Sequence, residues 1–355
     1  MKIKEFSIDN LYYEYDFNSS LDEKVNIIVG NNGSFKTTLL RLLRHAIACE
    51  KNGQFFQSRL TKITFKDGIV MEYHETENML SKDKDGEDII RNETSWTPML
   101  NGKRISDSEY RKLLKLDFIS TFDVKGDAKS SQDSYLDIRL EKLQSDYAYY
   151  LSDLVKELTD RINSNSSITK QELDKINERK NLFVRLVNEC FVETGKELSN
   201  DSTKLVFIKD NAIGIYPKEL SSGEKQLLII LLTVLLERGE EYILMLDEPE
   251  ISMHISWQYK LIDMILELNP NAQVLLTTHS PMIFADGWGD KAIHMEDITT
   301  NTRNIYNVNS NSITNKNHND KDSIHHRLVE GKVLQRPAGK RGQGDYRRPR
   351  RSVGT

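Results

Sequence analysis

The chain has 355 residues, of which 38% are hydrophobic, and its formal net charge is −5. This length and apolar content suffice for a full α/β core with a smaller second lobe, and the negative charge argues against a generic nucleic-acid binder. Cys49 and Cys190 have no metal-ligand or disulfide-framework spacing, which suits a reducing cytosol. The sequence shows no targeting segment and no apolar stretch of about 20 residues, so we expect a cytoplasmic protein without membrane contact.

A phosphate-binding loop is predicted near the N-terminus. After an alternating strand at residues 1–6, the apolar strand Val25 to Val29 leads into a glycine-containing loop and then into an apolar helix. Backbone N–H groups of such a loop and the positive end of the helix cradle nucleotide phosphates, while a lysine adds a point charge and a hydroxyl ligates Mg²⁺. We therefore expect ATP and Mg²⁺ here, with Thr37 as a metal ligand and the nucleotide held by Gly30, Asn31, Asn32, Gly33, Ser34, Phe35, Lys36, Thr37 and Thr38.

Phe35 departs from the motif G-x-x-x-x-G-K-[ST], which has glycine directly before the lysine. Glycine is used there because the chain bends close to phosphate without a Cβ atom, so Phe35 either tolerates this backbone or weakens the loop. Two outcomes stay open for ATP: hydrolysis, with turnover reduced by Phe35, or binding with negligible turnover.

The next segment alternates between apolar and polar residues and predicts a β-hairpin over residues 59–71 that turns at Lys66-Asp67-Gly68. Residues 75–108 are polar and charged, which predicts a mobile loop. We favour a solvated insertion for this loop over a binding role.

A helical hairpin is predicted from apolar residues that recur at spacings of three and four. The first helix runs from Leu136 to Ile162, residues 163–167 break it, and a second helix continues through Cys190 to a stop at Gly195. At 1.5 Å per residue, each arm is only about 40 Å long. The hairpin either packs on its own head or also offers a site for a partner protein.

Three further motifs follow in the C-terminal half. The stretch Leu220-Ser221-Ser222-Gly223-Glu224 precedes an apolar helix, Leu227 to Leu236. Asp247 ends the strand Tyr242 to Leu246, where it is placed to hold Mg²⁺, and Glu248 is placed to deprotonate an attacking water. His279 ends the strand Gln273 to Thr277, where it can reach a γ-phosphate. Alone, these residues would indicate a solvated turn and a satisfied polar histidine, but their order favours the catalytic interpretation.

After Ile298 the core is expected to end. Asn and Thr dominate residues 299–319, and arginines and lysines dominate the last stretch, so this tail is predicted to be disordered. Its basic residues are interpreted as a solvated charge run, with contact to nucleic-acid phosphates as the alternative. A tail of this composition is not expected to build a nuclease domain with clustered acidic metal ligands.

Together these motifs resemble the ABC-type ATPase heads, and among them the branch with SMC proteins, RecF and the overcoming-lysogenisation-defect ATPases. The resemblance covers residues 1–50 and about 205–298. It implies a head-to-tail homodimer with two composite sites, in which Ser221, Ser222, Gly223 and Glu224 act on the nucleotide bound by the partner subunit. It also implies that Ser252 and His254 lie near the dimer seam and that a glutamine senses Mg²⁺, for which Gln132 is a candidate.

We therefore predict an α/β fold, namely a P-loop ATPase head with a mixed or parallel core sheet, a flanking antiparallel sheet and an inserted helical hairpin. The predicted parts are the N-terminal part of the head at residues 1–135, the hairpin lobe at 136–200, the C-terminal part of the head at 201–298 and the tail at 299–355.

The resemblance also implies a function. ATP and Mg²⁺ would hold the dimer closed, and hydrolysis through Glu248 and His279 would release it. Stand-alone ATPases of this appearance resemble components of prokaryotic anti-phage defence systems, such as the Septu and PARIS types, which are paired with a separate effector nuclease or toxin. Two alternatives remain: a DNA repair or chromosome-maintenance ATPase that acts on DNA, and a nucleotide-gated scaffold with little turnover.

Overall fold

The computed structural model describes residues 1–49, 58–82, 88–120, 134–164, 169–199, 204–209 and 213–301. Gln132 and residues 302–355 of the predicted tail lie outside these ranges. None of the helices within them is both long and apolar enough to cross a membrane.

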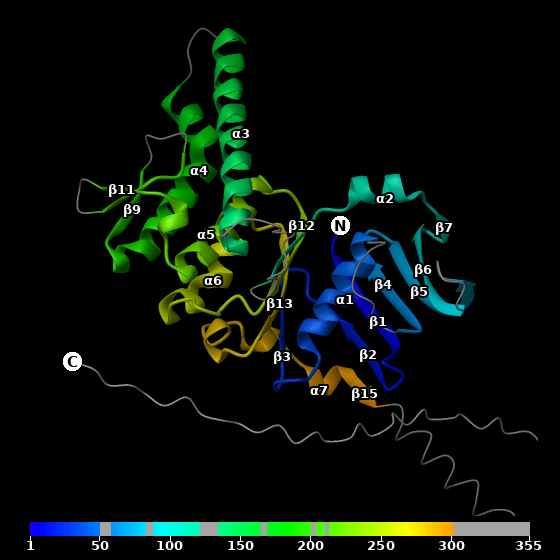
Figure 1. Cartoon of the computed structure of the whole chain (residues 1–355). Helices are drawn as coiled ribbons and strands as arrows, with labels where there is room; N and C mark the ends of the chain where they lie inside the picture. The colour runs from blue at the N-terminus through cyan, green and yellow to red at the C-terminus, as the bar shows by residue number, and fades with distance from the viewer. Residues whose placement is uncertain are drawn as a thin grey trace, which may run out of the picture. The chain divides into compact units, whose positions relative to one another are not determined.

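A parallel sheet of five strands lies at the centre of the fold (Figure 1). Every pair of neighbouring strands in this sheet is parallel. In sheet order the strands are β14 (Ala292–His294), β3 (Val25–Val29), β13 (Ala272–Thr278), β12 (Tyr242–Asp247) and β8 (Leu116–Ser120). Because neighbouring strands run the same way, their carboxyl ends meet at one edge, which is where ligands bind in open α/β sheets.

Both faces of the parallel sheet are buried, because alternate residues of a strand point to opposite sides. On β12, Tyr242, Leu244 and Leu246 pack into one apolar cluster, whereas Ile243 and Met245 pack into the other. The near-continuous apolar composition of β3, β12 and β13 follows from this double burial.

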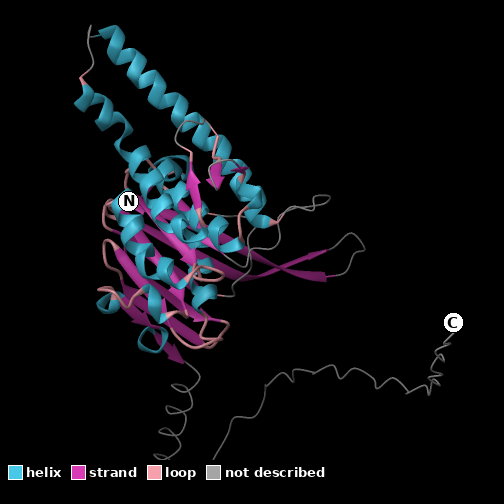
Figure 2. Cartoon of the chain, turned by 90° about the vertical axis from the view of Figure 1, so that its left-hand side faces the viewer, coloured by secondary structure: helices cyan, strands magenta, loops and turns pink. Residues whose placement is uncertain are grey.

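Four helices cover the first face. The first two, α3 and α4, form the predicted helical hairpin and run side by side in Figure 2. Near its base the hairpin packs on the head, because Leu140, Leu143 and Tyr147 of α3 and Phe183 and Val187 of α4 share one buried cluster with α5 and α6. The hairpin therefore packs on its own head, and the alternative of an additional site for a partner protein stays a prediction. The bounds are α3 Tyr135–Ser164, α4 Lys170–Phe191, α5 Ser222–Leu236 and α6 Ile255–Leu268.

The second face is covered by α1 (Lys36–Ala48) and by a seven-stranded sheet with antiparallel neighbours. This sheet confirms the hairpin predicted over residues 59–71, whose turn places Gly68 at φ +83°. In sheet order the strands are β15 (Thr299–Asn301), β2 (Tyr15–Ser20), β1 (Ile3–Leu11), β4 (Leu60–Phe65), β5 (Ile69–Lys82), β6 (Asp88–Leu100) and β7 (Lys103–Arg104).

The mobile loop predicted at residues 75–108 is wrong for residues 75–82 and 88–108, which the structure describes. Strand β5 continues to Lys82 and pairs with β6 from Ile69 opposite Leu100 to Lys82 opposite Asp88, and α2 (Asp107–Leu113) follows. Both described strands extend into the charged sequence run, to Lys82 on β5 and from Asp88 on β6. Residues with high strand propensity are spread along both strands, and their ladder of backbone hydrogen bonds does not require a strongly apolar sequence.

Short elements complete the head. A three-stranded sheet and two single-turn helices lie between the hairpin and α5 along the chain, and further short helices follow β13. Their bounds are β9 Lys196–Leu198, β10 Phe207–Lys209, β11 Ile213–Ile215, η1 Val192–Thr194, η2 Pro217–Glu219, η3 Pro281–Ile283, η4 Gly289–Lys291 and α7 Met295–Ile298. Residues Met1–Tyr306 cluster as one compact unit, and the predicted boundaries at 135, 200 and 298 stay predictions.

Candidate nucleotide site

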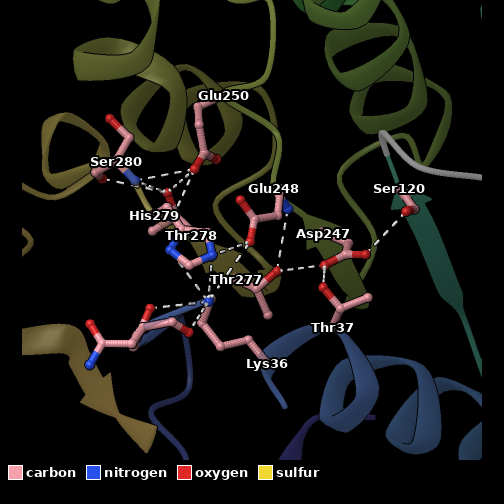
Figure 3. Close-up of polar contacts among 12 residues, drawn as sticks. Lys36, Thr37, Ser120, Asp247, Glu248, Glu250, Thr277, Thr278, His279 and Ser280 are labelled. Carbon is pink, nitrogen blue, oxygen red and sulfur yellow. Dashed lines mark hydrogen bonds and ion pairs between the residues drawn. The ribbon is translucent and has the colours of Figure 1, made fainter. Parts of the chain in front are cut away.

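The predicted motifs meet where the parallel strands end (Figure 3). The glycine-containing loop follows β3, Asp247 is the last residue of β12, His279 comes directly after β13, and Ser120 is the last residue of β8. Because these strands are parallel neighbours, four distant segments of the sequence bring their polar residues to one edge of the sheet.

The loop before α1 has the backbone of a phosphate cradle. Gly33 has φ +80°, which only glycine adopts without strain, and a Cβ atom on Gly30 would lie 2.7 Å from Ser34 Oγ. Helix α1 begins at Lys36 and has no acidic residue in its first turn. The positive end of the helix dipole and the loop N–H groups together suit an anion such as a phosphate.

Phe35 occupies the left-handed conformation that the motif requires at this position, with φ 68°. Its ring packs against the β1–β2 hairpin, with ring centroids 4.9 Å from Tyr15, 6.1 Å from Tyr12 and 6.3 Å from Phe17. Phe35 therefore adopts a backbone conformation that favours glycine, and its aromatic neighbours explain how a large side chain is held there. The predicted effect of Phe35 on the nucleotide stays a prediction.

Lys36 is the charged centre of the site and is only 4% exposed. Its Nζ atom donates to the carbonyl oxygens of Gly30, at 3.1 Å, and Asn31, at 3.3 Å. It also lies 2.7 Å from His279 Nε2 and 3.9 Å from Glu248 Oε1. Burial lowers the pKa of this lysine, and the neighbouring Glu248 carboxylate opposes that shift.

Asp247 is fully buried, and its carboxylate accepts hydrogen bonds from three hydroxyl groups. Its Oδ1 accepts hydrogen bonds from Thr37 Oγ1 at 2.9 Å and from Thr277 Oγ1 at 2.8 Å, and its Oδ2 accepts one from Ser120 Oγ at 3.1 Å. Arg41 Nε lies 3.9 Å from Oδ2. Hydroxyl and carboxylate oxygens are the ligands that Mg²⁺ prefers, so the predicted pair Thr37 and Asp247 fits a magnesium ion.

Glu248 lies beside this oxygen cluster with a left-handed backbone, at φ 52°. Its Oε1 lies 3.1 Å from His279 Nε2. Burial, followed by the negative charge of Glu250, raises the pKa of Glu248 to about 7. A carboxylate whose pKa lies near neutral pH is suited to accept a proton from water.

The imidazole ring of His279 lies next to both Lys36 and Glu248. Burial and then the positive charge of Lys36 lower the pKa of its imidazole, so the ring is neutral at pH 7 and can accept or donate one hydrogen bond at each nitrogen. Its backbone N–H donates to Glu250 Oε1 at 2.8 Å.

The sequence predictions missed three residues of this cluster: Ser120, Thr277 and Glu250. Ser and Thr at the ends of strands carry no distinctive signal by themselves. Glu250 follows Asp247-Glu248-Pro249, so its place in that motif was a signal that the prediction did not use.

The stretch Ser221 to Glu224 is positioned by the start of α5. Ser221 is the N-cap of the helix, and its hydroxyl accepts from the backbone N–H of Glu224. The Glu224 carboxylate is hydrogen-bonded to other residues of the same chain, because it also accepts from Lys196 Nζ at 2.6 Å and from Thr194 Oγ1 at 2.7 Å. These bonds lower the pKa of Glu224, against the effect of its burial.

Gly223 is packed directly against the loop that follows Glu248. A Cβ atom at Gly223 would lie 2.1 Å from the carbonyl oxygen of Ser252, which itself has φ 66°. His254 caps α6, and its Nδ1 lies 2.7 Å from Ser256 Oγ. The two stretches that the resemblance assigns to a dimer seam are thus in contact within one chain.

Comparison with known proteins places the chain in a family. Residues 101–286 match the family described as "AAA domain, putative AbiEii toxin, Type IV TA system". The chain is also 22% identical to "Septu protein PtuA" of Bacillus thuringiensis over 305 residues, which cover 79% of this chain and 72% of that protein.

Solved structures of SMC heads are similar at low identity. The SMC head domain from Thermotoga maritima is 14% identical, with a TM-score of 0.44, and the match covers 80% of this chain and 92% of that one. The Smc head domain with an extended coiled coil, bound to the C-terminal domain of ScpA derived from Pyrococcus furiosus, is 14% identical with a TM-score of 0.46, covering 88% and 99% of the two chains.

The family match spans just over half of the chain and includes Asp247, Glu248 and His279, although it begins after the phosphate loop. The protein therefore belongs to the AAA-domain ATPase family described as putative AbiEii toxin, Type IV TA system.

Proposed function

We propose that this protein binds ATP with Mg²⁺ and hydrolyses it to ADP and phosphate. The observation that carries the proposal is the convergence of Lys36, Thr37, Asp247, Glu248 and His279 at one edge of the parallel sheet. Phosphoryl transfer to water needs groups that position the phosphates, a metal site and a base for the attacking water. The cluster contains all three.

Each residue has a distinct role in this proposal. The loop from Gly30 to Thr38 and the Lys36 ammonium hold the β- and γ-phosphates. Thr37 and Asp247 hold the Mg²⁺ ion, which when bound neutralises charge on the phosphate oxygens. Glu248 accepts the proton of the attacking water, and His279 contacts the γ-phosphate.

The stretch from Ser221 to Gly223 has a role only in a dimer. Among the described residues, and apart from the backbone bonds within α5, its hydrogen bonds are to Glu224 and Lys225, and Gly223 packs against Ser252; none of these three residues belongs to the phosphate loop. We therefore propose that it acts on the nucleotide of a second copy, so that ATP closes a head-to-tail homodimer and hydrolysis opens it.

The biological role that we favour is the ATPase of a prokaryotic anti-phage defence system with a separate effector, a nuclease or toxin. The similarity to Septu protein PtuA supports this role at 22% identity. A repair or chromosome-maintenance ATPase acting on DNA is the alternative, and it predicts that double-stranded DNA stimulates turnover.

Glu248→Gln tests the proposed activity. Loss of the base should lower kcat by about 10²- to 10⁴-fold while ATP binding persists, because the amide keeps the shape of the carboxylate but cannot accept a proton. Turnover, ATP affinity and oligomeric mass are measured together for both proteins, with and without double-stranded DNA.

The matched control is Glu197→Gln, the same change at an exposed residue of β9, which should leave turnover unchanged. Wild-type protein that binds ATP but shows no turnover would contradict the hydrolysis proposal and make the chain a nucleotide-gated scaffold. Turnover that depends on DNA would instead favour the repair alternative.

A further inference from the structure

We propose that Glu250 is a positioning residue that fixes the loop carrying His279, and through it the histidine ring in the nucleotide site. This inference rests on the proposed ATPase function for its kinetic consequences, but the contact itself is a property of the folded chain. Figure 3 shows Glu250 on the side of residues 278–280 away from Lys36 and Thr37.

One oxygen of Glu250 makes three hydrogen bonds to three consecutive residues. Its Oε1 accepts from Thr278 Oγ1 at 2.6 Å, from the backbone N–H of His279 at 2.8 Å and from the backbone N–H of Ser280 at 3.2 Å. The chain leaves the sheet at Thr278, the last residue of β13, so these donors have no strand partner there. The carboxylate accepts from the His279 N–H and shares the Ser280 N–H with Thr278 Oγ1, which lies 2.9 Å from it, so it helps to fix the path of the loop.

The backbone contact matters because the polar contacts of the His279 ring depend on where its loop lies. The side chain is 36% exposed, so packing against the core constrains it weakly. Its Nε2 is nevertheless 2.7 Å from Lys36 Nζ and 3.1 Å from Glu248 Oε1. A loop displacement of about 1 Å would break these short contacts, and misplacement on that scale can reduce a rate by about 10²-fold.

A carboxylate suits this position better than an amide. The second oxygen, Oε2, is buried and has no hydrogen-bond partner among the described residues. In Glu250→Gln, the side-chain amide has two possible orientations. Its NH₂ group would either take the buried position of Oε2, where its donors are unsatisfied, or take the position of Oε1, where it would face the three donors of the loop. The glutamine variant should therefore be intermediate, and the alanine variant should lose the contact entirely.

Glu250 is separate from the oxygen cluster of Asp247. Thr37, Thr277 and Ser120 surround Asp247, whereas the three hydrogen bonds of Glu250 go to residues 278–280. Its hydrogen bonds would therefore act on the reaction through His279, whereas its negative charge also raises the pKa of Glu248, so the kinetics are compared at a pH well above that pKa. A double-mutant cycle detects such a dependence, because two residues that act as one unit show non-additive effects.

The kinetic test compares Glu250→Ala, His279→Ala and the double variant. We expect Glu250→Ala to lower kcat by roughly 10- to 100-fold with a much smaller change in KM for ATP. The kcat of Glu250→Gln should fall between that of Glu250→Ala and that of the wild type. When His279 is already alanine, adding Glu250→Ala should change kcat by less than about threefold. Effects that multiply in the double variant would overturn the proposal, as would an effect on KM alone.

Amide hydrogen exchange tests the contact without any turnover. In Glu250→Ala, the N–H groups of His279 and Ser280 should exchange faster than in the wild type, while Glu197→Ala, at an exposed position, should leave them unchanged. Unaltered exchange in Glu250→Ala would overturn the proposal. If the wild type does not hydrolyse ATP, the proposed function fails, yet the exchange result still decides whether Glu250 fixes this loop.

Discussion

Phe35 combines a strained backbone with favourable ring contacts. A non-glycine residue in the left-handed region costs about 1 to 2 kcal/mol, and Phe35 has φ 68°. Aromatic pairs contribute about 0.5 to 1.5 kcal/mol each beyond the burial of their area, and Phe35 contacts three aromatic rings. The two terms are of similar size, so the substituted loop can keep the shape of a phosphate cradle.

Two substitutions separate these contributions. Phe35→Gly loses the ring contacts but relieves the backbone, whereas Phe35→Ala loses the contacts and keeps the unfavourable φ. We expect the alanine variant to be less stable than the glycine variant by about 1 kcal/mol in chemical denaturation. We also expect ATP turnover of Phe35→Gly to stay within about tenfold of the wild type, a change below about 1.4 kcal/mol in activation free energy.

A different result would be informative for each measurement. Equal stability of the two variants would mean that the left-handed backbone relaxes when the ring is removed. A gain in turnover far above tenfold in Phe35→Gly would instead support the scaffold alternative, in which Phe35 suppresses hydrolysis in the natural chain.

Glu248 is expected to lower stability above neutral pH. Its pKa is raised from 4.5 to about 7, first by burial and then by Glu250, with Asp247 acting in the same direction and Lys36 opposing it. His279, the other titratable group in contact with it, is neutral at pH 7. Between pH 4.5 and 7 the folded protein therefore binds more protons at this site than the unfolded chain, and its stability falls as the pH rises.

Glu248→Gln should remove this loss of stability. We expect the free energy of unfolding of the variant to exceed that of the wild type at pH 8 and the difference to shrink towards pH 5, measured with a chelator and without nucleotide so that no metal contributes. Glu197→Gln, at an exposed site, should show no such trend. A difference that is constant across this pH range would show that the pKa of Glu248 is not raised.

Residues with a fixed place in a motif could be predicted from the sequence, and residues that act by proximity could not. Lys36, Asp247 and His279 each follow an apolar strand in the expected order, and the structure brings them together. Ser120 was not predicted because a serine after a strand is common, and its contact with Asp247 depends on β8 lying next to β12. That neighbour relation is a property of the sheet order, which no local pattern encodes.

At the scale of elements, the helices were predicted better than the strands. The apolar spacing of three and four placed α3 and α4 correctly, and Thr169 with Glu172 forms a capping box at the start of α4. The β5–β6 hairpin was missed because its polar composition resembles a solvated loop. The three-residue strands β9, β10 and β11 were missed because such short segments show no measurable alternation.

Contacts between elements also fix the start of α5. The Glu224 carboxylate, 1% exposed, joins the helix cap to Lys196 of β9, and Lys225 Nζ donates to Asp137 of α3 at 2.7 Å. The stretch proposed to act in trans is thus tied to both the short sheet and the helical hairpin. Movement of the hairpin would be transmitted to this stretch through these contacts.

At the scale of the whole molecule, the proposed trans action can be tested by mixing two inactive proteins. Lys36→Ala removes the phosphate contact, and Ser222→Arg blocks the exposed start of α5. In a mixed dimer, one site combines an intact phosphate loop with an intact Ser222, so random pairing should restore about a quarter of wild-type turnover. Mixtures as inactive as each parent would contradict action in trans.

Because Gly223 packs on Ser252, a substitution at position 223 should behave differently from Ser222→Arg in the mixing experiment. A Cβ atom there would meet the Ser252 carbonyl oxygen at 2.1 Å, so Gly223→Ala must displace the segment that also carries Glu248 and Glu250 of the same chain. Its mixture with Lys36→Ala should therefore stay inactive, unlike the mixture made with Ser222→Arg. In genetic terms, alleles at position 223 would fail to complement alleles in either half of the composite site.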